Sequence, residues 1–166
     1  ATLHNIKSHF NFYQSYKHVI CVSRHLKMLV NTLGAEVIYN GITPIKYQRV
    51  NLHAQYHLPI NKPIICAVGR LVPAKGFDIL LEAIDGLDVS LIIAGEGPQR
   101  FALEKFVMQM QKNTTVRLIG HHANPSNLMF SANGVVISSR REGFSYVFNE
   151  ALMCGTNILS TDVPVA

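Results

Sequence analysis

The sequence has little cysteine, little charge and no long apolar run. Its 166 residues include three cysteines, and charged side chains make up 15% of the chain. Cys21, Cys66 and Cys154 stand far apart in apolar surroundings, so we expect no disulfide framework and favour a reducing cytosol. No run approaches the ~18–20 apolar residues of a membrane-spanning helix, and the first residues lack the apolar core of a secretory signal peptide. Because 48% of the residues are apolar, a disordered charge-rich tail is also excluded.

Acidic residues are outnumbered, 10 against 15 Lys and Arg, for a net charge of +5. A basic surface favours phosphate-bearing ligands or anionic membrane faces, although an ordinary, mildly basic surface accounts for most of this excess. The basic residues are not interleaved with aromatics, so nucleic acid is not expected as a partner. Apart from the adjacent His121 and His122, the histidines are scattered without ligand spacing, and no metal site is expected.

Short β-branched apolar runs alternate with longer amphipathic ones. The predicted strands are residues 18–23, 36–39, 63–68, 89–94, 115–119, 134–138 and 156–160. Most are nearly continuous apolar runs, which is typical of strands covered on both faces. The predicted helices between the later strands are residues 77–84, 101–110, 125–131 and 146–154. This alternation predicts an α/β fold with a Rossmann-like, doubly wound parallel sheet.

The chain divides into three parts by composition. Residues 43–62 contain Pro44 and Pro59, several polar residues and no clear period, so we interpret them as a linker. Residues 1–42 hold one strand–helix–strand unit, too small for a domain alone. Residues 63–166 hold five predicted strands and four helices. A doubly wound sheet would usually carry another strand or a closing helix after these. We therefore expect a fragment of a longer protein.

The first strand after residue 62 ends in a loop with two cations, Arg70 and Lys75. In open α/β sheets, ligands bind at the carboxyl ends of strands, and Gly69 lets a ligand approach the backbone closely. Arg70 as a planar fork and Lys75 as a point charge would suit a diphosphate. Position alone leaves open that both are solvated surface charges.

Neither glycine-containing turn matches a nucleotide fingerprint. The loop after residue 68 lacks the Gly-Lys-Ser/Thr ending of a Walker loop. The run Gly95-Glu-Gly97-Pro98 has Arg100 where a dinucleotide motif needs its third glycine. We favour a tight strand-to-helix turn there, with Pro98 at the start of the helix.

Two acids lie either side of the start of the helix predicted from residue 146. Glu142 precedes the helix and Glu150 lies about two turns beyond. Carboxylates accept hydrogen bonds from paired sugar hydroxyls, and the amides of Gly143, Phe144 and Ser145 are donors that suit an anion. Ser145 also suits the N-cap. Taken alone, each acid is better explained as a surface acid near a helix start.

This last run resembles a known family. The sequence Glu142-Gly-Phe-Ser-Tyr-Val-Phe-Asn-Glu150-Ala-Leu-Met-Cys-Gly is similar to the E-x7-E motif of retaining glycosyltransferases of family 4 (glycosyl transferases group 1), which have the GT-B fold. Other segments resemble, in the family's order, the end of its first domain, its donor-diphosphate loop and its second strand and turn: residues 19–23, 37–42, 68–84 and 93–98. The resemblance covers nearly everything from residue 17 onward.

The resemblance implies a role for each matching position. Arg70 and Lys75 would bind the diphosphate of a nucleotide sugar and stabilise the leaving nucleoside diphosphate. Glu142 would hold hydroxyls of the donor sugar. Together with Arg70 and Lys75, it is one of the three expected catalytic residues. Glu150 would hold the ribose hydroxyls. The remaining expected donor-binding residues lie beside these groups or against the base: Gly69, Ile119, Gly120, His121, Gly143, Phe144 and Ser145.

The resemblance also implies a reaction. Family members transfer a sugar with retention and need no divalent metal, so no cofactor is expected beside the nucleotide-sugar substrate, a UDP-sugar by default. The expected enzyme is a hexosyltransferase acting on a cell-surface glycan or glycolipid of the lipopolysaccharide or capsule type. We expect it in the cytoplasm, in peripheral contact with the anionic inner face of the cytoplasmic membrane. The acceptor would bind a missing N-terminal domain, so the isolated chain is expected to bind donor weakly and transfer nothing.

Two positions depart from the family pattern, and the side chain of Ser145 leaves the sugar's identity open, because it would narrow the sugar pocket. Ser145 stands where the family usually has glycine, and Asn157 where it usually has proline. The alternatives are a nucleotide-binding module without transfer activity and a GT-B-fold nucleotide-sugar epimerase. An NAD-dependent oxidoreductase is disfavoured because the glycine fingerprint is missing.

Overall fold

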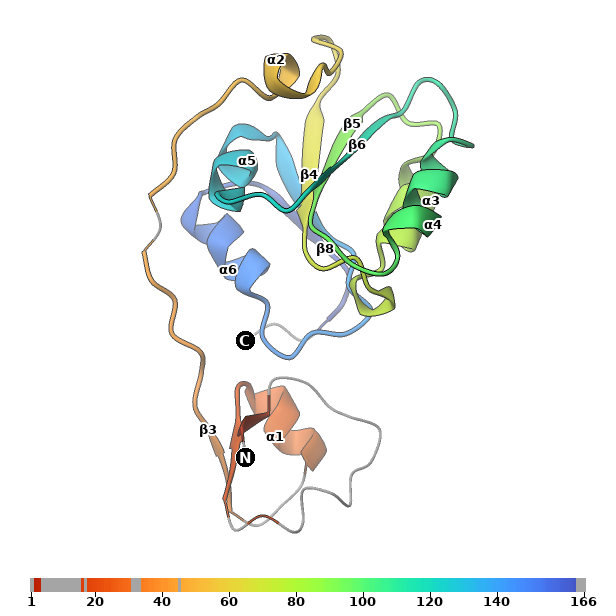
Figure 1. Cartoon of the computed structure of the whole chain (residues 1–166). Coiled ribbons are helices and arrows are strands. Elements are labelled where there is room, and N and C mark those ends of the chain that lie inside the picture. The colour runs from red at the N-terminus through yellow and green to blue at the C-terminus, as the bar shows by residue number, and fades with distance from the viewer. Residues whose placement is uncertain (1, 4–15, 17, 31–33, 45, 164–166) are drawn as a thin grey trace. The chain divides into compact units, whose positions relative to one another are not determined.

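The computed structural model describes residues 2–3, 16, 18–30, 34–44 and 46–163 (Figure 1). The chain forms two compact units. The first comprises Ala1–Thr43, Arg141–Tyr146 and Asp162–Ala166, and the second comprises Pro44–Arg140 and Val147–Thr161.

The second unit is built on a parallel sheet of five strands in the order β6-β5-β4-β7-β8. The chain builds outward from β4 in one direction through β5 and β6, then returns to the other side of β4 with β7 and β8. This reversal is the topological switch point of a doubly wound sheet, so the predicted fold class is confirmed. Each strand coincides with a predicted one: Ile64–Val68, Ser90–Ala94, Thr115–Gly120, Gly134–Ile137 and Ile158–Ser160 for β4 to β8.

Helices cover both faces of this sheet (Figure 1). Helices α3 (Phe77–Ile84) and α4 (Arg100–Val107) lie on one side, and α5 (Pro125–Ser131) and α6 (Tyr146–Met153) on the other. Strand β5 shows why its sequence is apolar from Leu91 to Ala94: Leu91 and Ile93 belong to one core cluster, and Ile92 and Ala94 to the other. Successive strand residues point to opposite faces, so two covered faces require a continuous apolar run.

The three cysteines are free and buried. Burial raises the pKa of the Cys66 thiol to about 12, and Cys66 belongs to the same core cluster as Cys154. Both thiols therefore act as small apolar core groups.

The segment predicted as a linker contains a short helix, α2 (Leu52–Tyr56). The Oδ1 atom of Asn51 caps it by accepting a hydrogen bond from the backbone N of Ala54 at 3.0 Å. Leu52 and Leu58 are buried in the core of the second unit. A helix of five residues is too short to show a period, which is why the sequence did not reveal it. The domain boundaries at residues 42 and 62 stay a prediction.

The first unit contains a parallel sheet in the order β1-β2-β3. Strands β2 (Val19–Cys21) and β3 (Ala35–Val37) match predicted runs, and α1 (Arg24–Val30) joins them. Strand β1 (Thr2–Leu3) was not predicted, because two residues carry no pattern. Val19, Val22 and Leu26 are among the buried core residues of this unit.

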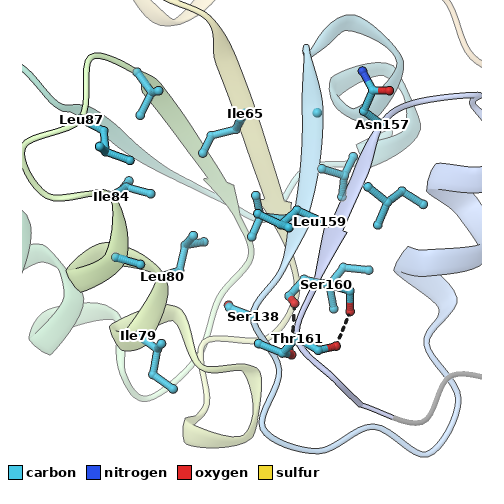
Figure 2. Close-up of a pocket in the computed structure, with 17 residues that line it drawn as sticks. Ile65, Ile79, Leu80, Ile84, Leu87, Ser138, Asn157, Leu159, Ser160 and Thr161 are labelled. Carbon is cyan, nitrogen blue, oxygen red and sulfur yellow. Dashed lines mark hydrogen bonds between the residues drawn. The ribbon is translucent and has the colours of Figure 1, made fainter.

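An apolar groove of about 550 Å³ lies beside α3 and over β7 and β8 (Figure 2). Side chains such as Ile65, Leu80, Ile84 and Leu159 line it. None of the lining residues carries a charge. The groove therefore has no group that could neutralise a phosphate.

Among the described residues, no helix is both long and apolar enough to cross a lipid bilayer.

Candidate functional site

A smaller cavity of about 300 Å³ lies at the carboxyl ends of β4, β5 and β6. It brings together Gly69, Arg70 and His121, three of the residues predicted to bind a donor. The loops after parallel strands converge at one edge of a sheet. This is why Gly69 and Arg70 lie near His121, although the two loops are far apart in sequence. This cavity is lined by Val68, Gly69, Arg70, Ala94, Gly95, Glu96, His121, His122 and Pro125.

Sequence reasoning missed Glu96 and His122 as cavity residues. Each is the second residue after a strand, Glu96 after β5 and His122 after β6. The same rule about strand ends that singled out Arg70 would have found them. Ile119 and Gly120 lie in β6 beside the cavity without lining it, and the carbonyl of Gly120 accepts a hydrogen bond from the backbone N of Gly95 at 2.8 Å.

The two glycines after β5 allow that loop to pack closely against the backbone of the loop after β4. A Cβ atom on Gly95 would lie 1.8 Å from the carbonyl oxygen of Gly69, and one on Gly97 would lie 2.4 Å from that of Leu71. The backbone N of Leu71 donates to the carbonyl of Glu96 at 2.9 Å. These contacts agree with the tight-turn interpretation of this run.

Lys75 ends a short 3₁₀ turn, Pro73–Lys75, in the loop that also carries Arg70. Its side chain runs beside Gly69, because its Cδ and Cε atoms lie 3.6 Å from where a Cβ on Gly69 would stand. The hydrocarbon part of the Lys75 side chain therefore passes beside Gly69, the residue before Arg70. Both predicted diphosphate cations thus belong to one loop at the carboxyl end of β4.

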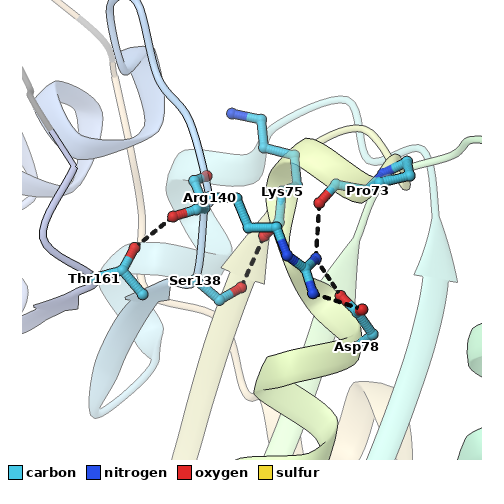
Figure 3. Close-up of polar contacts among 7 residues, drawn as sticks. Pro73, Lys75, Asp78, Ser138, Arg140 and Thr161 are labelled. Atoms are coloured by element: carbon cyan, nitrogen blue, oxygen red, sulfur yellow. Dashed lines mark hydrogen bonds and ion pairs between the residues drawn. The ribbon is translucent and has the colours of Figure 1, made fainter.

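The segment after β7 packs against this turn (Figure 3). Arg140 makes a two-pronged ion pair with Asp78, Nη1 to Oδ1 at 2.7 Å and Nη2 to Oδ2 at 2.9 Å. Its Nη1 also donates to the carbonyl of Pro73 at 2.9 Å, and Ser138 Oγ donates to that of Lys75 at 2.9 Å. Sequence reasoning assigned no role to Arg140 or Ser138, since a single sequence does not show which distant residues pair.

The Arg140 guanidinium lowers the pKa of the Asp78 carboxyl, chiefly by its hydrogen bonds. A group whose pKa is lower in the folded state stabilises the fold above its unfolded pKa, and that contribution disappears as the pH falls through the folded pKa. We expect Asp78→Asn to lower the free energy of unfolding at pH 7 but to have little effect near pH 3. Urea denaturation of both proteins at the two pH values measures this, and an equal difference at both would contradict it.

Glu150 lies in α6 and is partly buried. Desolvation by burial raises the pKa of its carboxyl. Its charge in turn raises the pKa of the Cys154 thiol, an effect second to that thiol's own burial. Glu150 does not line the 300 Å³ cavity, so its contact with a donor ribose stays a prediction.

Glu142, Gly143, Phe144 and Ser145 belong to the first unit. Phe144 packs against that unit's core. Ser145 is buried and directly precedes α6, at the predicted helix start. The donor-binding roles of these four residues, and the catalytic role of Glu142, stay predictions.

Within the described part of the chain, no three His, Cys, Asp or Glu side chains gather as they would around a metal ion. His122 is engaged locally, where its Nδ1 accepts a hydrogen bond from the backbone N of Asn124 at 3.2 Å. The expectation that the reaction needs no metal stays a prediction.

The fold resembles part of solved glycosyltransferase structures. The Anabaena protein HepE, solved in complex with UDP and glucose, matches with a TM-score of 0.76 at 21% identity. The match covers 93% of this chain and 47% of that one. At this level of identity, the likeness shows a shared fold. The class is thus an α/β domain with the architecture of about half of such a chain.

Sequence comparison identifies the family. The family described as "Glycosyl transferases group 1" matches residues 48–166. One component of the phosphatidylinositol N-acetylglucosaminyltransferase of Homo sapiens is 31% identical in an alignment over 159 residues that covers 88% of this chain and 32% of that protein. An uncharacterised glycosyltransferase of Methanocaldococcus jannaschii is 31% identical over 151 residues, 87% of this chain and 40% of that protein.

The chain belongs to the glycosyl transferases group 1 family, and the resemblance in its sequence is confirmed. It spans about a third to two fifths of the length of these two relatives.

Proposed function

We propose that this chain is the donor-binding part of a glycosyltransferase, and that it binds a nucleoside diphosphate sugar at the carboxyl ends of β4, β5 and β6. The observation that carries the proposal is the cavity of about 300 Å³ that brings Gly69 and Arg70, after β4, together with His121, after β6. Lys75 approaches the same loop along Gly69. Family membership supports this assignment over an unrelated nucleotide-binding role.

In this proposal, the two cations bind the diphosphate. Arg70 offers a planar fork of N–H donors and Lys75 offers a compact ammonium. When the bond between the anomeric carbon and the diphosphate oxygen breaks, negative charge develops on the leaving nucleoside diphosphate. Cations already in position stabilise that charge without reorganisation, which lowers the barrier. These residues can supply the neutralisation that a divalent metal supplies elsewhere.

The base and the sugars flank the diphosphate. His121, with the β6 residues Ile119 and Gly120, would lie against the base. Glu150 would accept hydrogen bonds from the ribose hydroxyls, and Glu142 from the donor sugar. The amides of residues 143–145 would assist Glu142. UDP is the proposed nucleotide, in line with the UDP bound to HepE.

The acceptor we propose is a glycan or glycolipid of the cell surface, such as lipopolysaccharide or capsule, and the sugar is transferred with retention. The human relative has phosphatidylinositol in its name, which supports a lipid-linked acceptor. A peripheral position at the inner, anionic face of the cytoplasmic membrane fits the net charge of +5. Acceptor binding requires a partner domain, so the chain alone is expected to transfer nothing.

A nucleotide titration tests this proposal. UDP, GDP, ADP and NAD are titrated separately into the purified chain and followed by calorimetry or NMR. We expect a nucleoside diphosphate to bind, UDP most tightly, and NAD to bind more weakly. Binding of NAD without binding of any nucleoside diphosphate would overturn the proposal in favour of an oxidoreductase.

The raised pKa of Glu150 predicts a pH dependence. Ribose hydroxyls donate to the ionised carboxylate, so protonation should weaken binding, and the raised pKa moves this loss above the usual range of a glutamate. UDP-glucose is the suitable ligand, because its diphosphate has no group that titrates near neutrality. We expect its affinity to fall as the pH is lowered for the wild type, and the fall to begin at a lower pH for Glu150→Gln, in which Glu142 is the remaining carboxylate of the proposed site. Parallel pH profiles for the two proteins would remove Glu150 from the site.

A further inference from the structure

We propose that Arg140 is a positioning residue for the diphosphate site: with Asp78, it fixes the turn that carries Lys75 and acts on the diphosphate only through Lys75. This inference rests on the proposed function of that loop. It adds a residue pair that lies outside the expected donor contacts.

The segment after β7 binds three successive carbonyls of the turn, and Figure 3 shows the contacts with Pro73 and Lys75. Arg140 Nη1 donates to the carbonyl of Pro73 at 2.9 Å, and the backbone N of Arg140 donates to that of Ala74 at 2.8 Å. Ser138 Oγ donates to the carbonyl of Lys75 at 2.9 Å. With all three carbonyls held, the backbone that directs the Lys75 side chain has little freedom to rotate.

The two segments are packed backbone against backbone. Gly76, directly after the turn, has a φ of 63°, and a Cβ there would lie 2.1 Å from the carbonyl oxygen of Ser138. The segment itself is held from its other side, since Thr161 Oγ1 donates to the carbonyl of Ser139 at 2.6 Å. The turn thus packs against the segment after β7, which is itself bonded to the residue after β8.

The guanidinium of Arg140 is engaged with Asp78 rather than open to another anion. Both of its Nη atoms donate to the two carboxylate oxygens, at 2.7 and 2.9 Å. Asp78 is in the first turn of α3, which directly follows Gly76. This ion pair therefore connects the segment after β7 to α3. An arginine whose fork is occupied by a carboxylate contributes geometry to a neighbouring site more than net charge.

The test measures UDP affinity in variants of the whole chain. Arg140→Met keeps the stem and removes the fork, and Asp78→Asn removes the partner's charge. Glu82→Gln is the matched control, because it removes the same charge from an exposed position on the same helix. We expect both test variants to weaken UDP binding about tenfold, less than complete removal of the charge-assisted contact of Lys75 would. Glu82→Gln should leave binding unchanged or slightly tighter.

The sign of the Asp78→Asn effect separates the two roles that Arg140 could have. Removing an acid near an anion site raises affinity by charge alone, so a loss of affinity identifies a geometric role. If instead Asp78→Asn tightens UDP binding while Arg140→Met weakens it, Arg140 binds the diphosphate directly and the inference is overturned. Unchanged affinity in Arg140→Met also overturns it.

A second comparison uses Lys75→Ala as the background. If Arg140 acts through Lys75, Arg140→Met should cause less than a twofold further loss there. An equal loss with and without Lys75 would show a general structural role and contradict the inference. A wild-type chain that binds no UDP would overturn the proposed function and this inference with it, whereas binding by the wild type with equal affinity in Arg140→Met removes the inference alone.

Discussion

Replacing both Arg70 and Lys75 with alanine should abolish detectable UDP binding. Each cation is expected to contribute ~1.5–3 kcal/mol, the range for hydrogen bonds to charged groups. The double variant would then lose ~3–6 kcal/mol, or more than a hundredfold in affinity. Both residues belong to the loop after β4, and Arg70 lines the cavity, so their charges are expected to act on one ligand group.

The matched control for this loss is Lys105→Ala with Lys112→Ala. Both lysines are exposed, and together they remove the same net charge from α4 and from the loop that precedes β6. Calorimetric titration of the two double variants at equal ionic strength separates a local effect from a general one. Equal losses in both would show that UDP responds only to total charge, and the loop would not be the diphosphate site.

The second large effect is expected for Gly95→Ala, which should destabilise the chain by ~2–6 kcal/mol. At a φ of 153° the backbone of Gly95 is in a region that side chains rarely adopt, a strain of ~1–3 kcal/mol. The added Cβ would also lie 1.8 Å from the carbonyl oxygen of Gly69. Forcing the two loops apart adds an overpacking cost of ~1–3 kcal/mol. Because domains are stable by only ~5–15 kcal/mol, such a loss removes a large share of the chain's stability.

Gly41→Ala is the control for this effect. A Cβ on Gly41 meets nothing within 4 Å, so the substitution should leave stability nearly unchanged. Urea denaturation followed by far-UV circular dichroism suits a chain without tryptophan. A Gly95→Ala variant as stable as the wild type would mean that the loops after β4 and β5 are not packed as closely as described.

The sheet could be predicted because its burial leaves a simple trace in the sequence. Leu91 and Ile93 serve one core and Ile92 the other, so β5 is an unbroken apolar run between polar turns. The same logic failed for α2 and β1, which are too short for any period. Leu52 and Leu58 join the core from a stretch rich in proline and polar residues, and only the folded chain shows that they are covered.

The candidate site likewise has residues that the sequence predicts and residues that it does not. Gly69, Arg70 and His121 could be predicted together, because each follows or ends a parallel strand and those ends converge. The pair of Arg140 and Asp78 could not, since its members are 62 residues apart and a single sequence does not show which distant residues pair. The roles of Glu142 and Glu150 come from the family motif, and they await a measurement with bound donor.

The 550 Å³ groove and the 300 Å³ cavity differ in what they offer a nucleotide. The larger groove, beside α3, has an uncharged, mainly apolar lining. The smaller cavity has Arg70 and the backbone of the loop after β4. Binding a diphosphate requires cations and N–H donors rather than volume, so chemistry favours the smaller one.

The most direct test of this account is a map of amide chemical shifts of the ¹⁵N-labelled chain as UDP is added. We expect the shifts to concentrate at Gly69, Arg70, Lys75 and His121, with little change at Leu159 beside the larger groove. Shifts confined to the residues around Leu159, or no shift in the loop after β4 at saturating UDP, would contradict the proposed diphosphate site.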